Sequence, residues 1–483
     1  MKIIHISAEC YPAAKAGGLA DVVGSLPKYL NRSGMEASVV MPYYKTTWIS
    51  SVETEFIYEG EAPAEGGFFS FQIHRLKNSK LGFELYLVDA NGRFDRPGVY
   101  IDPWTGHPYW DEKERFFTFQ IAALEWLNSF DEKPDLIHCH DHHTGLVPFM
   151  MKECFRYEAF REIPSVITIH NGEYQGRYSM DSYSFLPAFN LERVGMLEWD
   201  GAMNCLAAGI KNSWMVTTVS KGYMQELLEF CHGLEVLLRA EKEKTIGIVN
   251  GIDSEVWDPE SDPLVVKNYG LKTADKGKKA NKNEICTLFD LSPSKPLISF
   301  IGRLVLEKGA DLIPDMIQKC FDEGLDASFA ILGTGDPVIE KIFRELNKSL
   351  PGYFHAKLEY NEQLAHRIYA GSDFLLMPSR VEPCGLNQLY SMRYGTLPVV
   401  RKTGGLADTV IDIEKKNGYG IVFEEFSLKQ LKDSMQRAVD FYGKKELFKK
   451  NRERMMKLDF SWEKSAGEYI GIYKNLQPTK PEK

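Results

Sequence analysis

Two cations lie five residues apart in a segment suited to phosphate chemistry. Arg303 and Lys308 belong to Gly302-Arg-Leu-Val-Leu-Glu-Lys-Gly309, which directly follows the apolar run 297–301. At the carboxyl end of a strand, a guanidinium offers bidentate contacts and an ammonium offers a point charge, so the two could clamp a diphosphate without a metal. The alternative is a solvated basic turn that pairs with Glu307. In either case both cations are expected at an exposed turn.

A glutamate follows another apolar run. Glu382 lies in Pro378-Ser-Arg-Val-Glu-Pro-Cys-Gly-Leu386, after Phe-Leu-Leu-Met at 374–377, and Pro383 suits the first turn of a helix. A carboxylate at a sheet edge could bind sugar hydroxyls or stabilise a developing cation. It could equally be the partner of a helix dipole. The residues alone leave both interpretations open.

A glycine pair occurs twice in nearly the same wording. Residues 15–23 (KAGGLADVV) and 402–410 (KTGGLADTV) agree at seven of nine positions. Each pair follows an apolar run and opens an amphipathic stretch, where glycine lets backbone amides approach a ligand and a helix N-terminus favours an anion. The alternative is a tight turn that needs glycine for backbone reasons. The repetition indicates two related lobes.

Histidines cluster in His138-Cys-His-Asp-His-His143. Histidine and carboxylate are favoured zinc ligands, but successive side chains of a strand point to opposite faces, so we expect that these residues cannot all converge on one ion. Asp141 and one or two histidines are expected to reach a site. His170 ends the apolar run 165–169 and could be functional or structural.

The elements that would position these groups alternate along the whole chain. Short β-branched runs separated by amphipathic stretches are typical of parallel strands covered by helices on both faces. The Lys-rich segment 271–284 interrupts this rhythm and is interpreted as a solvated helix or loop, or as a binding segment. We predict two doubly wound α/β domains, 1–254 and 255–459, then a helix over 460–476 that packs back on the first domain and a frayed tail, 477–483.

Composition excludes several classes of function. The 483 residues include 58 basic and 67 acidic ones, a net charge of -9, so no global basic field exists to hold nucleic acid or an anionic membrane. Eight scattered cysteines without a CxxC pair, and an N-terminus without a signal-peptide core, predict a reduced, cytoplasmic protein. A dinucleotide oxidoreductase is disfavoured because no complete GxGxxG follows the first strand.

Together these motifs resemble those of bacterial glycogen synthases and plant starch synthases, over about residues 2–476. The resemblance implies the GT-B architecture, two Rossmann-like domains facing a central crevice, and glucose transfer from ADP-glucose to the nonreducing 4-OH of glycogen or another α-1,4-glucan with retained configuration. It implies no metal or other cofactor. A UDP-glucose-preferring glucan synthase and a glucan phosphorylase are the alternatives. A non-catalytic glucan-binding protein would need no phosphate clamp. The sequence makes no prediction of oligomeric state.

The resemblance also implies residue roles. Arg303 and Lys308 would hold the pyrophosphate, Glu382 would face the glucosyl group, and Asp141 and His170 would lie on the sugar side. Further donor-binding positions, with Tyr360 stacking on the base, are Lys15, Gly18, Asp21, Asn250, Tyr360, Cys384, Gly385, Leu386, Gly404 and Gly405. Tyr100, in a loop of variable length, is a possible sugar contact. Retention could follow from a carboxylate nucleophile or from front-face attack. The front-face route is favoured because no second carboxylate is spaced with Glu382 as in a glycosidase.

Overall fold

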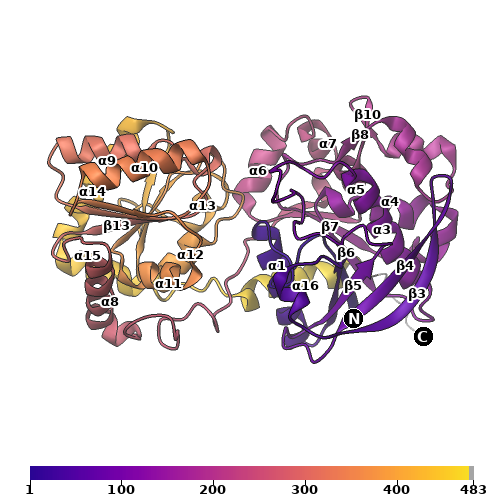
Figure 1. Ribbon diagram of the computed structural model, residues 1–483, viewed down its shortest axis with the longest axis horizontal. Helices are drawn as coiled ribbons and strands as arrows, with labels where there is room; N and C mark the ends of the chain where they lie inside the picture. Colours follow the sequence, from indigo (N-terminus) through magenta and orange to yellow (C-terminus); the bar gives the residue numbers. More distant parts are fainter. Residues whose placement is uncertain (478–483) are drawn as a thin grey trace. The chain divides into compact units, whose positions relative to one another are not determined.

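In the computed structural model, which describes residues 1–477, the chain divides into two α/β units (Figure 1). Unit 1 comprises Met1–Val219, Met224–Ile248 and the segment from Trp462 onward, and unit 2 comprises Ser220–Tyr223 and Val249–Ser461. The division after Ile248 falls a few residues before the expected boundary at 254. Most of the tail that we expected to fray, 478–483, lies outside the described residues.

The main sheet of unit 1 has nine strands in the order β12-β11-β7-β6-β1-β2-β5-β4-β3. Neighbours from β12 to β5 pair in parallel, whereas β4 runs antiparallel to β5 and to β3. The strands are β1 (Lys2–Ile6), β2 (Glu36–Pro42), β3 (Thr54–Ala64), β4 (Gly67–Leu76), β5 (Glu84–Asp89), β6 (Leu136–His140), β7 (Ser165–Ile169), β11 (Met215–Thr218) and β12 (Thr245–Gly247).

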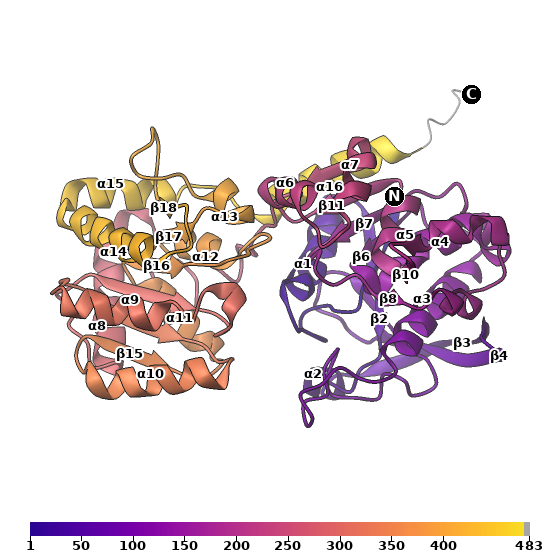
Figure 2. The ribbon, with the colours of Figure 1, turned by 90° about the horizontal axis from the view of Figure 1, so that it is seen from above.

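The β3–β4 hairpin was not predicted from the sequence. It forms the outer pair of the sheet (Figure 2), and most of its residues are exposed or half-buried instead of forming a continuous buried apolar run. A second, antiparallel sheet has the order β8-β10-β9, with β8 (Arg177–Tyr178), β9 (Glu198–Trp199) and β10 (Ala202–Asn204). A doubly wound fold therefore describes most of unit 1, and these antiparallel pieces are additions to it.

The sheet of unit 2 has six strands, all parallel, in the order β15-β14-β13-β16-β17-β18. Helices α9 and α10 lie on one side of it and α11 and α12 on the other (Figure 1). The strands are β13 (Leu297–Ile301), β14 (Ser328–Leu332), β15 (Phe354–Lys357), β16 (Phe374–Met377), β17 (Leu397–Arg401) and β18 (Ile421–Phe423).

Helices connect these strands throughout the chain. Up to residue 248 they are α1 (Gly18–Arg32), α2 (Thr47–Ser50), α3 (Glu112–Asn128), α4 (Leu146–Glu153), α5 (Cys205–Asn212), α6 (Lys221–Glu229) and α7 (Glu235–Ala240). Beyond it they are α8 (Ala274–Leu288), α9 (Ile313–Asp322), α10 (Pro337–Ser349), α11 (Glu362–Gly371), α12 (Asn387–Arg393), α13 (Gly404–Thr409), α14 (Leu428–Gly443), α15 (Lys445–Met455) and α16 (Trp462–Leu476). No helix within residues 1–477 is long and apolar enough to cross a membrane.

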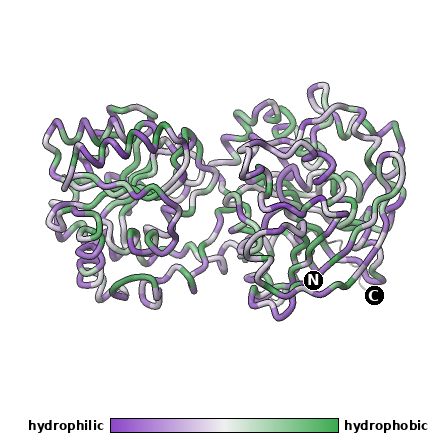
Figure 3. Tube along the Cα trace, in the orientation of Figure 1, coloured by the Kyte–Doolittle hydropathy of each residue, from purple (hydrophilic) through white to green (hydrophobic). Residues whose placement is uncertain are grey.

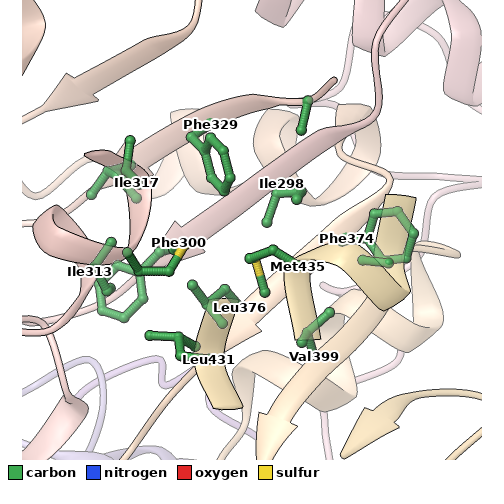
Figure 4. Close-up of a cluster of buried hydrophobic side chains, with 14 of the residues drawn as sticks. Ile298, Phe300, Ile313, Ile317, Phe329, Phe374, Leu376, Val399, Leu431 and Met435 are labelled. Carbon is green, nitrogen blue, oxygen red and sulfur yellow. The ribbon is translucent and has the colours of Figure 1, made fainter. Parts of the chain in front are cut away.

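Apolar strand residues form the core of unit 2. Hydrophobic residues follow the central strands and hydrophilic ones the outer helices (Figure 3). Phe300 and Phe329 from neighbouring strands pack with Ile313 of α9 and Leu431 of α14 (Figure 4). Burial on both faces explains why these strands are continuous apolar runs in the sequence.

The Lys-rich segment is a helix, but it is not simply a solvated one. Within α8, Lys278 and Lys282 are 3% and 6% exposed. The Lys278 ammonium donates to the Tyr369 carbonyl oxygen at 3.1 Å, and Lys282 lies 2.6 Å from a carboxylate oxygen of Asp373. Lysines of this helix therefore anchor it to unit 2, because a buried ammonium requires such partners.

The last helix, α16, belongs to the core of unit 1. Trp462, Tyr469 and Tyr473 pack with Val22 and Leu26 of α1. The Tyr473 hydroxyl also lies 2.7 Å from Nδ1 of His138, in the central strand β6. This contact ties the C-terminal helix to the sheet.

We predict that Tyr473→Phe lowers the free energy of unfolding by about 1 to 3 kcal/mol, because Nδ1 of the buried His138 loses its partner. Urea unfolding curves measure the change. Tyr44→Phe is the matched control, since the buried Tyr44 hydroxyl has no partner among the described residues. Equal effects of the two substitutions would show that the hydrogen bond to His138 contributes nothing specific.

Candidate active site

An ion pair at the carboxyl edge of the unit 2 sheet joins two of the residues singled out by sequence. The Lys308 ammonium, in a turn that follows β13, lies 2.8 Å from Oε1 of Glu382, which follows β16. The Ser379 hydroxyl donates to the other carboxylate oxygen, also at 2.8 Å. Glu382 is 7% exposed, so both of its oxygens have partners in a largely buried setting. Sequence reasoning did not single out Ser379.

The expectation that both cations lie at an exposed turn is wrong for Lys308. Its side chain is only 21% exposed, whereas that of Arg303 is 62% exposed and lies 3.2 Å from Glu307. Burial by itself lowers the Lys308 pKa, but the carboxylates of Glu382 and Glu307 outweigh it and raise the pKa, so the ammonium stays charged. The ion pair between Arg303 and Glu307 is exposed to solvent, so it restrains the Arg303 side chain only weakly.

Glu382 does not begin a helix, which corrects one interpretation of the proline that follows it. The next helix, α12, starts at Asn387, so Glu382 is no partner of that helix dipole. In the loop between Glu382 and α12, burial raises the pKa of the Cys384 thiol to about 12, and Gly385 has a φ of +73°. Leu386 immediately precedes the helix. The segment therefore presents Glu382 from an irregular loop.

The second glycine pair packs against this loop. A Cβ on Gly404, where φ is +41°, would lie 2.2 Å from the Glu382 carbonyl oxygen, and one on Gly405 would lie 2.1 Å from that of Cys384. The Gly405 amide donates to the Glu382 carbonyl at 3.0 Å. Close packing of backbone against backbone explains why glycine occurs here, which agrees with the alternative that the turn needs glycine for backbone reasons.

The first glycine pair has different surroundings. A Cβ on Gly17 or Gly18 would meet nothing within 4 Å, so close packing within the chain does not require glycine there. The amide of Gly17 donates to Oε2 of Glu9 at 3.0 Å. Lys15 and Asp21 form an ion pair at 2.7 Å across the start of α1. Open space around this turn is compatible with the close approach of a ligand.

Glu9 organises this part of unit 1, and sequence reasoning missed it. It is 3% exposed, and besides the Gly17 amide it accepts hydrogen bonds from the Ala16 amide and, at 2.7 Å, from the Tyr100 hydroxyl. Burial raises its pKa although these donors oppose the shift. A carboxylate three residues after an apolar strand was the available signal. The Tyr100 ring also stacks on His143 at 4.6 Å, so the hydrogen bond to Glu9 and this ring contact together hold Tyr100 in place.

Asp141 and His170 lie at the carboxyl ends of the adjacent strands β6 and β7. Oδ1 of Asp141 accepts a hydrogen bond from the His170 amide at 2.7 Å. Burial raises the Asp141 pKa to about 7, although backbone amides of His170 and Asn171 lower it, and the charge of Glu9 raises it further. Asp141 has a φ of +57°, a strained conformation that is common at functional sites.

The histidines of the cluster do not all converge on one point, as strand alternation predicted, because His138 and His140 belong to one group and His142 and His143 to another. His138 and His140 are two residues apart and share one face of β6, where they meet His5 of β1. Nitrogens of His140 lie 3.0 Å from His170 Nε2 and 3.1 Å from His5 Nδ1. His138 contacts Tyr473 and, at 2.6 Å, Thr168. Since both nitrogens of His138 and of His140 already have partners, the group fits a hydrogen-bonded network better than a metal site.

These imidazoles are neutral. Burial lowers the pKa of His5 and His170 to about 3 and takes those of His138 and His140 well below the usual value. The other group close enough to share an ion within residues 1–477 is Glu112, His142 and His143.

Two further predicted positions belong to unit 2. Asn250 is 5% exposed, its backbone hydrogen-bonds to the Cys384 sulfur, and its Oδ1 is buried without a partner in the described chain. Tyr360 follows β15 and is 76% exposed. β15 is three places from β16 in the sheet, so Tyr360 stands apart from the cluster around Glu382. Each unit therefore gathers most of its predicted residues at one sheet edge.

The chain is similar to known proteins over nearly its whole length. A family profile described as "Starch synthase catalytic domain" matches residues 2–240, and one described as "Glycosyl transferases group 1" matches residues 289–455. The chain is 46% identical over 474 residues to a glycogen synthase from Flavobacterium johnsoniae, covering 98% of each chain. It is 39% identical over 498 residues to one from Thermodesulfovibrio yellowstonii, covering 99% of this chain and 98% of the other.

A solved structure is similar over the same span. It is the catalytic domain of starch synthase IV from Arabidopsis thaliana bound to ADP and acarbose, with a TM-score of 0.88 and 32% identity. The match covers 98% of this chain and 99% of that one.

We predict that Asp141→Asn stabilises the protein more at pH 8 than at pH 5. The folded carboxyl keeps its proton up to about pH 7, against 3.8 when unperturbed, so its contribution to stability is lost as pH rises between these values. The difference between variant and wild type should grow by about 2 to 3 kcal/mol from pH 5 to pH 8.

Urea unfolding at the two pH values measures this difference, and Asp181→Asn, at an exposed position, is the control. A difference between Asp141→Asn and wild type that is the same at both pH values would contradict the assignment of a protonated, buried carboxyl.

Proposed function

Because the chain belongs to the family of bacterial glycogen synthases and starch synthases, we propose that it transfers glucose from ADP-glucose to the nonreducing 4-OH of an α-1,4-glucan with retention of configuration. The observation that carries the proposal is the Lys308–Glu382 pair at the strand edge of unit 2, next to the exposed Arg303. This site combines charge for a phosphate with a carboxylate for a sugar.

The chemistry of glucosyl transfer needs such charges. Breaking the bond between the anomeric carbon and the phosphate oxygen gives an oxocarbenium-like transition state, while negative charge grows on the leaving diphosphate. Preorganised cations at that phosphate stabilise the charge as it develops. Arg303 and Lys308 would supply them, and Glu382 would stabilise the positive charge on the sugar. For this, the diphosphate would replace Glu382 as a partner of Lys308.

Front-face attack is the route we favour for retention. The acceptor 4-OH would form the new bond at the anomeric carbon on the side from which the diphosphate leaves, and its proton would pass to the leaving phosphate oxygen. The other carboxylate beside Lys308, that of Glu307, is also engaged by Arg303. The Glu307 carboxylate is thus engaged by two cations and is not free to act as a nucleophile.

Adenine is the proposed base and Tyr360 its stacking partner. The exposed ring at the end of β15 can offer a flat face, and stacking contributes roughly 1 to 3 kcal/mol per base. The Arabidopsis starch synthase structure, solved with ADP and acarbose, supports this choice of nucleotide and of a glucan-like acceptor. UDP-glucose remains the competing donor, because stacking tolerates either base.

All eight cysteines are free thiols, which suits the reducing cytoplasm.

The test is the rate of nucleotide diphosphate release with glycogen and each of the two nucleotide glucoses, in buffer that contains excess chelator. We expect kcat/KM to be at least about tenfold higher with ADP-glucose, and we expect chelator to have no effect, because the two cations supply the charge that a metal gives elsewhere.

Arg303→Ala is the matched variant. It should lose about 100- to 1,000-fold in kcat, while the free energy of unfolding changes by no more than about 0.5 kcal/mol, since the side chain is exposed. A higher kcat/KM with UDP-glucose would reject the donor assignment. Rescue of a chelator-abolished rate by added manganese would reject the metal-free mechanism.

A further inference from the structure

Two tryptophans in unit 1 are exposed to an unusual degree. Trp104 is 80% and Trp110 is 88% exposed, the two highest fractions among large hydrophobic residues in the described chain. Both lie between β5 and α3, in the segment 96–111. Tryptophan is normally extensively covered, so two such side chains on one segment call for a ligand rather than a packing explanation.

The segment that carries them is an ordered hairpin. The guanidinium of Arg96 holds the carboxylate of Asp111 with two hydrogen bonds and so closes its base. Further out, Ile101 and Pro108 form an antiparallel bridge, and the Asp102 amide donates to the His107 carbonyl at 2.9 Å. These contacts fix the backbone on both sides of the indoles, which lowers the entropic cost of binding through them.

The tryptophans are set among polar groups. The Trp104 amide is itself held by the Asp102 carboxylate at 2.9 Å, and the neighbouring Thr105 and His107 are exposed. A protein interface of useful affinity needs a contiguous apolar centre. Separate indoles with exposed hydroxyl and imidazole groups between them in the segment, and the Asp102 carboxylate just before them, suit a ligand that has both apolar faces and hydroxyl groups, as a chain of pyranose rings does.

The hairpin is continuous with the candidate site of unit 1. Tyr100, at its start, donates to Glu9, and Glu9 in turn holds the amides of Ala16 and Gly17 in the open glycine turn. A glucan chain lying along the hairpin would thus lie next to Tyr100, which is linked through Glu9 to the backbone of the glycine turn.

We propose that Trp104 and Trp110 form a docking platform for an α-glucan chain, outside the residues that contact the reacting groups. The proposal rests on the proposed function for the identity of the acceptor. The platform holds a long acceptor chain. It therefore contributes to the affinity for glycogen more than to turnover, and it contributes little to the affinity for short maltooligosaccharides.

Electrophoresis of the full chain in native gels, with and without glycogen, tests binding without any need for catalysis. We expect glycogen to retard the wild-type protein, Trp104→Ala and Trp110→Ala each to weaken the interaction about three- to tenfold, and the double variant to weaken it more. Phe68→Ala is the control, because Phe68 is 70% exposed on β4 of the same unit. It should be retarded like the wild type.

Initial rates with ADP-glucose provide the second measurement. The double variant should show a higher KM for glycogen, with unchanged kcat and an unchanged KM for maltotriose. Undiminished retardation of the double variant would overturn the proposal. So would a loss of self-association of the double variant in light scattering with glycogen binding intact, since the platform would then be a protein interface.

Failure of the proposed function gives a different result. A wild type that is retarded in a tryptophan-dependent way but releases no nucleotide diphosphate would contradict the transferase and support the platform. If the wild type transfers glucose but glycogen retards the double variant as much as the wild type, the result would support the transferase and contradict the platform.

Discussion

The ion pair between Lys308 and Glu382 is the interaction on which the unit 2 site depends. Removing one member of a buried pair leaves an uncompensated charge, which is far more costly than the pair itself is stabilising. The backbone around it is fixed accordingly. Gly309, with a φ of +70°, approaches the Pro378 carbonyl so closely that a Cβ would lie 2.3 Å from it, and Gly404 packs on Glu382 itself. Two turns from different strands thus hold the segment 378–384 in place.

In unit 1, the two central carboxyl groups are paired with hydrogen-bond donors instead of with a lysine. These groups, those of Glu9 and Asp141, are buried, and burial raises the pKa of both although the hydroxyl and backbone donors around them oppose the shift. Burial likewise keeps His170 neutral. Buried hydrogen-bonding groups would suit the recognition of sugar hydroxyls, whereas the charged pair of unit 2 would suit a diphosphate.

The sequence predicted the parts of the structure that depend on local pattern. Most of the parallel strands are largely apolar runs because they are buried on both faces, and both glycine turns follow such strands. The β3–β4 hairpin escaped because its alternation is irregular. The ion pair could not be predicted, since Lys308 and Glu382 are 74 positions apart and their burial depends on the packing of two loops. The sharing of a face by His138 and His140 could have been read from their spacing of two.

In the proposed reaction a diphosphate replaces Glu382 as a partner of Lys308, and calorimetric titration of ADP into wild type and Glu382→Gln measures this exchange directly. If the carboxylate competes with the phosphates for the ammonium, the amide should tighten ADP binding by at least about threefold, because a negative charge next to Lys308 is removed. Glu345→Gln, which removes an exposed charge on α10, should leave the affinity unchanged. Equal or weaker ADP binding by Glu382→Gln would contradict the account.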